Sequence, residues 1–288
     1  MLNRTMSLRA VCAITAAAAL SAHANAERIW GLTTTNELIS FQSSNPLMAT
    51  GPMAITGLGS GVTLMGIDFR PANGMLYGLG SNSQLYTINT MTGAASAVGG
   101  PFSSAISGTS FGFDFNPTVD RIRITSNTGQ NLRAHPDTGA LLFVDGALNY
   151  NAGDINFGQP AGIVASAYTN NFAGTTTTTL FNLDAVLDTL VKQDPPNAGG
   201  LVTIGSTGVD ITNLTGFDIS TQGNAYVAIE RGGVPSWLYS IDLNTGAMAL
   251  IGEIGAGMLL ADISVAIPAP GSLTLLAASG LLVARRRR

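Results

Sequence analysis

Only 10% of the 288 residues are charged, whereas charged residues make up about a quarter of an average soluble domain. Six of the thirteen basic residues lie at the two ends of the chain, so residues 27–267 hold seven basic residues against seventeen carboxylates, a net charge of −10. This acidic balance argues against a nucleic-acid partner and against adhesion to an anionic membrane surface.

Residues 1–26 have the pattern of a secretory signal peptide. Arg4 and Arg9 form a positive start, residues 10–20 form a short apolar core, and small residues precede a cleavage site after Ala26. The apolar run is too short to span a bilayer as an anchor. The sequence therefore predicts an exported protein.

Export removes most of the residues that nucleophilic catalysis needs. The only cysteine, Cys12, and one of two histidines, His23, lie in the signal peptide. The exported domain then has no thiol for a disulfide, a zinc site or catalysis. The remaining histidine, His135, is followed by a proline and a Thr-Gly turn, which favours a surface residue over a catalytic base. These features favour a non-catalytic protein.

Internal repeats dominate the sequence between the ends. The clearest copy contains four short segments of alternating apolar and polar residues, which are separated by turn residues and lie at residues 65–71, 75–80, 84–89 and 94–99. The first segment recurs as Gly112-Phe113-Asp114-Phe115 and Gly216-Phe217-Asp218-Ile219, and more weakly as Ala261-Asp262-Ile263. Four strands in a period near 45 residues are typical of β-propeller blades.

The ends of the repeat region are complementary. The region begins at residues 29–32 with a segment that aligns with a second strand, and it ends at residues 261–266 with a first strand. One blade is then shared between the two termini, which closes the ring and hides its sheet edges. We expect an all-β propeller of five four-stranded blades over residues 27–267, with an open solenoid or sandwich as the alternative.

The fourth unit is irregular and leaves a count of six blades open. Residues 185–191 (AVLDTLV) have helical spacing before a Pro-Pro pair, which predicts a short helix or a turn on the rim.

Four aspartates recur in the predicted first strands, which face the central channel of a propeller: Asp68, Asp114, Asp218 and Asp262. A ring of carboxylates there is a candidate site for a hard cation, Ca²⁺ above all. The alternative is architectural, with each aspartate accepting backbone hydrogen bonds from the neighbouring blade. An oxygen-rich stretch from Asp145 to Asn156 lacks EF-hand spacing and is expected to be a solvated loop.

The densest charged group of the domain contains Asp120, Arg121, Arg123 and Arg133. Arginines form paired hydrogen bonds with carboxylates, so the three arginines are a candidate clamp for an acidic ligand such as a sugar acid. The alternative is an internal salt bridge with Asp114 or Asp120.

The C-terminal segment contains Pro268-Ala269-Pro270, an apolar run over residues 271–284, and four arginines, Arg285–Arg288. A helix of fourteen residues spans about 21 Å, less than the roughly 30 Å hydrocarbon core. The segment resembles the PEP-CTERM sorting signal of exported proteins, with Ala269 in place of the usual glutamate. The resemblance implies processing by an exosortase-type membrane peptidase in a Gram-negative bacterium that makes exopolysaccharide. An ordinary tail anchor is the alternative.

The repeats resemble a family of uncharacterised exported bacterial domains, a domain of unknown function often carried with such tails. The resemblance rests on residues 66–71, 85–89 with Thr92-Gly93, 112–133, 145–150 and 168–171. It implies no particular activity.

Together, these features predict a non-catalytic binding or matrix module at the cell surface or outside the cell, with exopolysaccharide as a candidate partner. The C-terminal helix is expected to be its only contact with the inner membrane, and a transient one. The alternative is a metal-dependent hydrolase or lactonase that works at an aspartate-lined channel.

Overall fold

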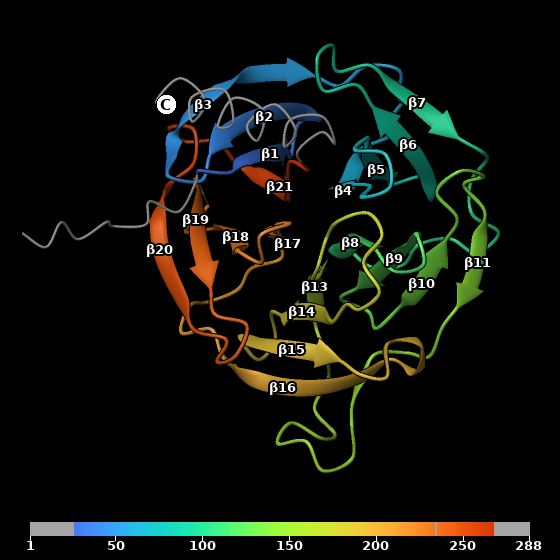
Figure 1. Ribbon diagram of the computed structural model, residues 1–288, viewed down its shortest axis with the longest axis vertical. Coiled ribbons are helices and arrows are strands. Elements are labelled where there is room, and N and C mark those ends of the chain that lie inside the picture. Colours follow the sequence, from blue (N-terminus) through green and yellow to red (C-terminus); the bar gives the residue numbers. More distant parts are fainter. Residues whose placement is uncertain (1–25, 234, 268–288) are drawn as a thin grey trace, which may run out of the picture.

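The computed structural model describes residues 26–233 and 235–267, which form five β-sheets around a central axis (Figure 1). The predicted five-bladed β-propeller is confirmed. Apart from Ala26, the predicted signal peptide lies outside the described residues, and so does the sorting tail. Within the described part of the chain, no helix is long and apolar enough to cross a membrane.

Each blade has four antiparallel strands, ordered from the central axis outward. Blade 1 contains β21 (Leu260–Val265), β1 (Arg28–Thr33), β2 (Glu37–Gln42) and β3 (Asn45–Ala54). Blade 2 contains β4 (Leu64–Phe69), β5 (Leu76–Gly80), β6 (Gln84–Ile88) and β7 (Ala95–Val98). Blade 3 contains β8 (Phe111–Asn116), β9 (Arg121–Ser126), β10 (Asn131–Ala134) and β11 (Leu141–Val144).

The last two blades follow the same order. Blade 4 contains β13 (Ile163–Tyr168), β14 (Leu180–Asp184), β15 (Thr189–Gln193) and β16 (Gly200–Ser206). Blade 5 contains β17 (Thr215–Ile219), β18 (Ala225–Glu230), β19 (Ser236–Ile241) and β20 (Met248–Glu253). Blade 4 also gains a short fifth strand, β12 (Asn149–Tyr150), which pairs in parallel with β16.

Blade 1 closes the ring as the sequence predicts. Its innermost strand, β21, is the last strand of the chain and pairs antiparallel with β1, the first. The register places Trp30 opposite Ser264 and Gly31 opposite Ile263. Among the strands that the structure describes, no other pair of neighbouring strands is so far apart in the sequence.

The helical spacing of residues 185–191 does not produce a helix. Residues 185–188 form the turn of the β14–β15 hairpin, in which Asp184 lies opposite Thr189, and Asp188 adopts a φ of 51°. The apolar residues that mimic a helical face belong to this turn and to β15. A 3₁₀ helix, η1 (Pro196–Ala198), follows instead, between β15 and β16.

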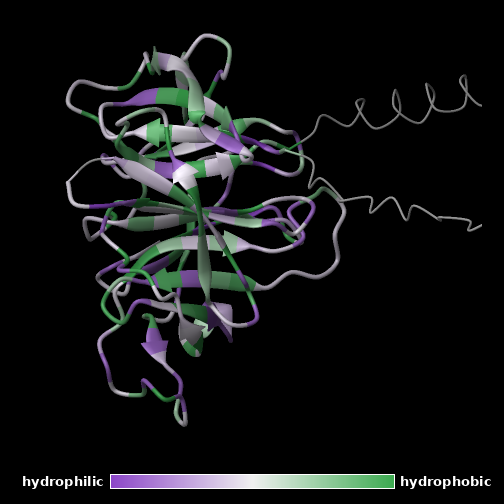
Figure 2. Ribbon diagram, turned by 90° about the vertical axis from the view of Figure 1, so that its left-hand side faces the viewer, coloured by the Kyte–Doolittle hydropathy of each residue, from purple (hydrophilic) through white to green (hydrophobic). Residues whose placement is uncertain are grey.

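Apolar clusters fill the space between most neighbouring blades. One cluster lies between blades 1 and 2, one between 2 and 3, one between 4 and 5, and one between 5 and 1. Between blades 2 and 3, Tyr77 and Phe115 meet edge to face with ring centres 5.1 Å apart. Because neighbouring blades cover both faces of the inner strands, every residue of β5 and of β13 is buried. Figure 2 shows hydrophobic residues in strands throughout the domain.

The space between blades 3 and 4 is different. Part of it holds a small apolar cluster that includes Leu148 and Tyr150. The rest is packed with buried polar side chains, which we call the polar seam: Arg123, Thr125, Asn131, Ser166, Tyr168, Asn182 and Gln193. None of them is more than 2% exposed.

Candidate functional site

Three of the four predicted aspartates occupy equivalent positions on the innermost strands. Asp68 lies on β4, Asp114 on β8 and Asp218 on β17, and each pairs across its hairpin with a residue near the start of the next strand. One oxygen from each of the three carboxylates lies within 4.8 Å of the others. The sequence repeat thus brings three carboxylates together near the axis.

Asp262 does not occupy the fourth equivalent position. The register of blade 1 gives that position to Ser264, which lies opposite Trp30, while Asp262 comes two residues earlier, opposite Leu32. In blade 4 the equivalent residue is Ala167, opposite Phe181. The ring at this level therefore contains three carboxylates, one hydroxyl and one methyl group.

All four aspartates accept backbone hydrogen bonds from the next blade. Asp262 accepts from the N–H of Ile67 (2.8 Å), and Asp68 accepts from that of Phe115 (2.8 Å). The other two make the same kind of contact, Asp114 with Tyr168 (3.3 Å) and Asp218 with Val265 (2.6 Å). The Ser264 hydroxyl lies within hydrogen-bonding distance of both Asp68 (2.9 Å) and Asp218 (3.2 Å). These contacts join one innermost strand to the next.

Burial keeps these carboxyl groups from ionising readily. Loss of water raises the pKa of Asp68, Asp114 and Asp262 well above the ordinary value of 3.8, and it raises the pKa of Asp218 to about 7. A neighbouring carboxylate, Asp218 for Asp68 and Asp68 for Asp114, raises the pKa further. A cation at this cluster would have to displace protons and compete with backbone N–H groups for the same oxygens.

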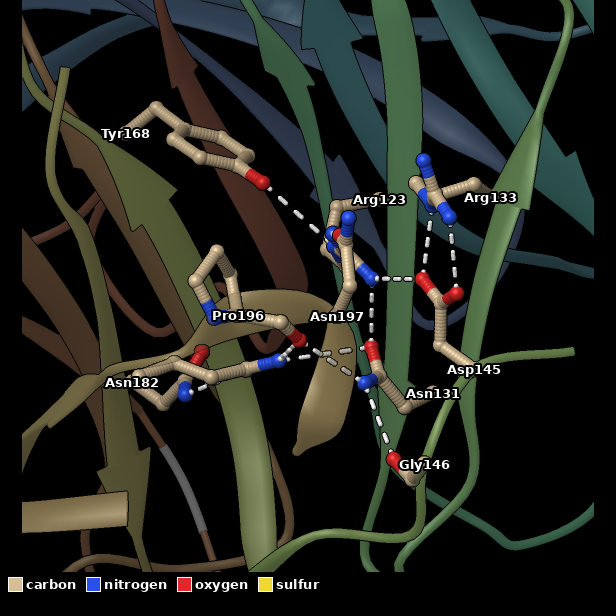
Figure 3. A network of polar contacts seen from close by, with 10 residues as sticks. Arg123, Asn131, Arg133, Asp145, Gly146, Tyr168, Asn182, Pro196 and Asn197 are labelled. Carbon is tan, nitrogen blue, oxygen red and sulfur yellow. Dashed lines mark hydrogen bonds and ion pairs between the residues drawn. The ribbon is translucent and has the colours of Figure 1, made fainter. Parts of the chain in front are cut away.

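Two of the three predicted clamp arginines, Arg123 and Arg133, hold a carboxylate of the protein itself, and the third lies apart. Arg123 is buried in the polar seam, where its Nη1 atom lies 2.6 Å from Asp145 and 2.7 Å from Asn131 (Figure 3). Arg133 holds the same Asp145 carboxylate through two hydrogen bonds of 2.7 and 2.8 Å. Arg121 lies apart and donates to the backbone carbonyls of residues 119 and 120.

The expected internal salt bridge exists, but with a different partner. Asp145, from the stretch expected to be a solvated loop, pairs with Arg123 and Arg133. Asp120 pairs instead with Arg70 of blade 2 (2.5 Å), whose guanidinium also contacts Asp137. Since its hydrogen-bonding groups are occupied by the protein, the Arg123 guanidinium is unavailable to an acidic ligand.

Amide side chains extend the polar seam across to blade 4. Gln193 donates to the carbonyl of Pro196 in η1 (2.6 Å) and accepts from Asn182 (2.9 Å). Asn131 donates to the same Pro196 carbonyl (3.0 Å), as Figure 3 shows. The Tyr168 hydroxyl accepts from Arg123 Nε (3.3 Å). The seam is thus a connected hydrogen-bonded network and not a set of isolated polar residues.

The polar seam opens into a recess of about 430 Å³, which we call the blade 3–4 recess. Tyr168, Gln193 and Pro196 of the network form part of its wall. The rest comes from the β8–β9 turn (Asn116 and Thr118), the threonine run of the β13–β14 loop (residues 176–179), Leu180, and residues 192 and 194. This volume lies in the range of small-ligand pockets, about 300–1,000 Å³.

Sequence reasoning missed most of this recess. Asn182 is a polar residue in the middle of the strand segment Leu-Phe-Asn-Leu-Asp, Gln193 ends the next strand, and five successive threonines end at residue 179. A polar residue in the middle of a buried strand is the signal that was available. It does not reveal the partner blade, because the contacts join residues up to 74 positions apart.

Solved structures with a similar fold have little sequence in common with the chain. A chain of a nidogen/laminin complex aligns at 11% identity with a TM-score of 0.51, covering 84% of this chain and 98% of that one. A structural-genomics protein of unknown function from Bacteroides thetaiotaomicron aligns at 15% identity and a TM-score of 0.49 over 78% of this chain, which spans 57% of that protein's length. The glutaminyl cyclase of Myxococcus xanthus gives 12% identity and a TM-score of 0.42, covering 80% of this chain and 96% of that one.

The first of these likenesses shows the propeller fold alone, since a shared fold does not carry a shared function. A search of curated proteins finds no match. A family model does match the sequence, over residues 37–264, which run from the second strand of blade 1 to the strand that closes the ring. The chain belongs to the family described as Domain of unknown function (DUF4394).

Proposed function

We propose that this domain is a non-catalytic binding module of the cell envelope or extracellular matrix, and that its partner is an extracellular polysaccharide. One observation carries the proposal. Four of the five spaces between blades are filled by apolar clusters, whereas the space between blades 3 and 4 holds a polar network that opens into a recess. Replacing buried polar groups by apolar ones is often neutral or stabilising, so departures from apolar packing concentrate at functional sites.

The alternative function, a metal-dependent hydrolase or lactonase, has less support. The carboxylates that such an enzyme would use, Asp68, Asp114 and Asp218, are each only 1% exposed and already accept hydrogen bonds. A catalytic group must reach its substrate directly or through one water molecule. The buried cluster gives a substrate no such access, which favours an architectural role.

Export and sorting belong to the same proposal and rest on the sequence of the two ends. The signal peptide would bring the domain out of the cytoplasm, and residues 268–288 would direct it to the envelope through an exosortase-type peptidase. Deleting residues 268–288 should move the protein from the envelope fraction to the medium. An unchanged distribution would contradict a sorting role for this segment.

The binding proposal is tested by co-sedimentation. Purified residues 27–267, which include both strands of the ring closure, are mixed with exopolysaccharide from the producing organism, with Ca²⁺ and with a chelator. We expect saturable binding that persists in the chelator, because none of the three clustered carboxylates lines the recess. An absence of binding in both conditions would contradict the proposal. Binding that depends on Ca²⁺ would instead give the aspartates a role as cation ligands.

A further inference from the structure

We infer that the blade 3–4 recess binds an uncharged, polyhydroxylated sugar unit, through hydroxyl and amide groups that the protein leaves without partners. This inference rests on the proposed function and adds the site and the chemical class of the ligand. It is argued from the hydrogen-bonding groups on the wall, the rigidity of the wall and the charge around it.

Several groups on the wall have hydrogen-bonding capacity to spare. The Asn116 Oδ1 atom accepts from Thr118 within its own turn (3.0 and 2.7 Å), but no described residue accepts from its Nδ2 atom. The side-chain hydroxyls of Thr176 and Thr179 form no hydrogen bond with a described residue. The Tyr168 hydroxyl accepts a hydrogen bond from Arg123, but no described residue accepts its proton. A wall with free donors and acceptors suits a ligand whose hydroxyl groups do both.

The rear of the recess is rigid before any ligand arrives. Gln193 is fixed by hydrogen bonds to Pro196 (2.6 Å), Asn131 (3.3 Å) and Asn182 (2.9 Å). Tyr168 is held by Arg123, which Asp145 anchors in turn. A wall held by buried contacts loses little freedom when a ligand binds, so more of the interaction energy appears as affinity.

The charges near the recess favour an uncharged ligand. The lysine on its rim, Lys192, already pairs with Asp194 at 2.8 Å. The guanidinium behind the wall, Arg123, is 2% exposed and bonded to Asp145, Asn131 and Asn197. An acidic sugar would find both of these cations already paired and would meet a domain of net charge −10, which opposes its approach.

Other recesses lack this combination. Recesses of about 480 and 380 Å³ lie at the outer ends of the spaces between blades 4 and 5 and between blades 5 and 1. The first is backed by Tyr239 of an apolar cluster, whose buried hydroxyl has no partner among the described residues. The second is backed by Tyr226 of another apolar cluster, whose hydroxyl donates to Glu27 (2.9 Å). The recess at the mouth of the channel measures only about 160 Å³. The blade 3–4 recess is the one of these four whose wall contains residues of the polar seam.

The test compares variants that remove single hydrogen-bonding groups. Asn116→Asp keeps the acceptor used by Thr118 and removes the free donor, and Thr176→Val with Thr179→Val removes two hydroxyls at constant volume. Thr90→Val, in a turn of blade 2 far from the recess, is the matched control because its side chain bonds to no described residue. Thermal unfolding of each protein confirms that the fold is retained.

The binding partner in the test is exopolysaccharide of the producing organism, separated by anion exchange into uncharged and acidic fractions. We expect the unmodified full chain to bind the uncharged fraction. Asn116→Asp and the Thr176/Thr179 double variant should each bind this fraction about tenfold more weakly. Thr90→Val should bind it as tightly as the unmodified protein does. Hydrogen exchange of residues 170–180 should slow when the polysaccharide is bound.

The other outcomes separate the two proposals. If the recess variants bind as tightly as the unmodified protein, the assigned site is wrong while the binding function stands. If only the acidic fraction binds, the class of ligand is wrong. If neither fraction binds to the unmodified protein, the proposed function itself fails.

Discussion

Arg123 and Asp145 form a buried ion pair, with Nη1 and Oδ2 2.6 Å apart and side chains that are 2% and 7% exposed. The pair joins the second strand of blade 3 to the segment that leaves its last strand, and Asn197 of η1 bonds to the same guanidinium at 2.7 Å. The Arg123 guanidinium thus connects two blades whose interface combines a small apolar cluster with the polar seam.

Removal of this carboxylate should destabilise the domain strongly. Asp145→Ala leaves the buried Arg123 without its counterion and also releases Arg133. Breaking one partner of a buried pair costs about 3–5 kcal/mol, because the remaining charge stays out of water. Urea unfolding should show this loss in the free energy of unfolding, and a loss below about 1 kcal/mol would contradict the assigned role.

The two arginines of β9 should respond differently to the same change. Arg123→Met removes the hydrogen bonds of the guanidinium to Tyr168, Asn131, Asp145 and Asn197. Arg121→Met removes only contacts with two backbone carbonyls at the surface. Arg121→Met should alter the free energy of unfolding by less than about 0.5 kcal/mol. Paired urea titrations check the contrast, and equal effects would show that the seam does not depend on its guanidinium.

The buried aspartates should make the domain less stable as the pH rises. The pKa of Asp218 is about 7 in the folded protein and 3.8 when exposed, so the folded state binds more protons between these values. The stabilisation from the protonated form is fully present below pH 3.8 and is lost as the pH rises towards 7. The raised pKa values of Asp68, Asp114 and Asp262 act in the same direction.

Asp114→Asn is the variant that isolates this effect. Its carboxylate accepts one hydrogen bond, from the N–H of Tyr168, which an amide oxygen can replace. The variant should lose less stability than the unmodified protein between about pH 4 and 7, as measured by melting temperature. Asp210→Asn at an exposed position is the control. Parallel curves for all three proteins would show that Asp114 ionises normally.

Chelation should leave the melting temperature unchanged at neutral pH. The carboxyl groups of Asp68 and Asp218 already accept hydrogen bonds from backbone N–H groups and from the Ser264 hydroxyl. Melting curves with a chelator and with excess Ca²⁺ should therefore coincide. A rise with Ca²⁺ that disappears in Asp68→Asn would instead identify the cluster as a cation site.

Gly216 should tolerate no side chain. A Cβ atom at this position of β17 would lie 2.5 Å from the backbone nitrogen of Ile263 and 2.8 Å from the Cα atom of Asp262, both on β21. Gly216→Ala should push blade 5 away from blade 1 and cost about 1–3 kcal/mol of stability. Gly51→Ala, where a Cβ meets nothing within 4 Å, is the control in the same urea titration.

Sequence repetition predicted the propeller well because each blade repeats its own local pattern. The alignment of residues 29–32 with a second strand correctly predicted the shared blade, since strand pairing follows from the phase of the repeat. Repetition also misled the assignment of Asp262. Its Asp-Ile pair resembles Asp218-Ile219, but the register places Ser264 at the repeated position.

The candidate recess was harder to predict because it depends on contacts between blades. Strand patterns record which residues of one sheet are buried, but not which residues face them from the next sheet. Asp145 was expected in a loop exposed to solvent for a separate reason: it follows the last strand of its blade, and the strand pattern does not show that the chain there returns to two arginines of the same blade. Asn182 and Gln193 of blade 4 form a polar face because Gln193 meets Asn131 of blade 3, and strand patterns do not record this contact.

The pairing of β1 with β21 also sets the order in which the molecule can assemble. Blades 2 to 5 each need only a continuous stretch of chain, so they can form locally, while blade 1 must wait for its last strand. Joining the two ends of the domain carries the largest loop-closure entropy in the ring, although this cost grows only with the logarithm of length. The ring therefore closes last. Until then, two unpaired strand edges face solvent, and the incomplete molecule is most open to pairing with another chain at that stage.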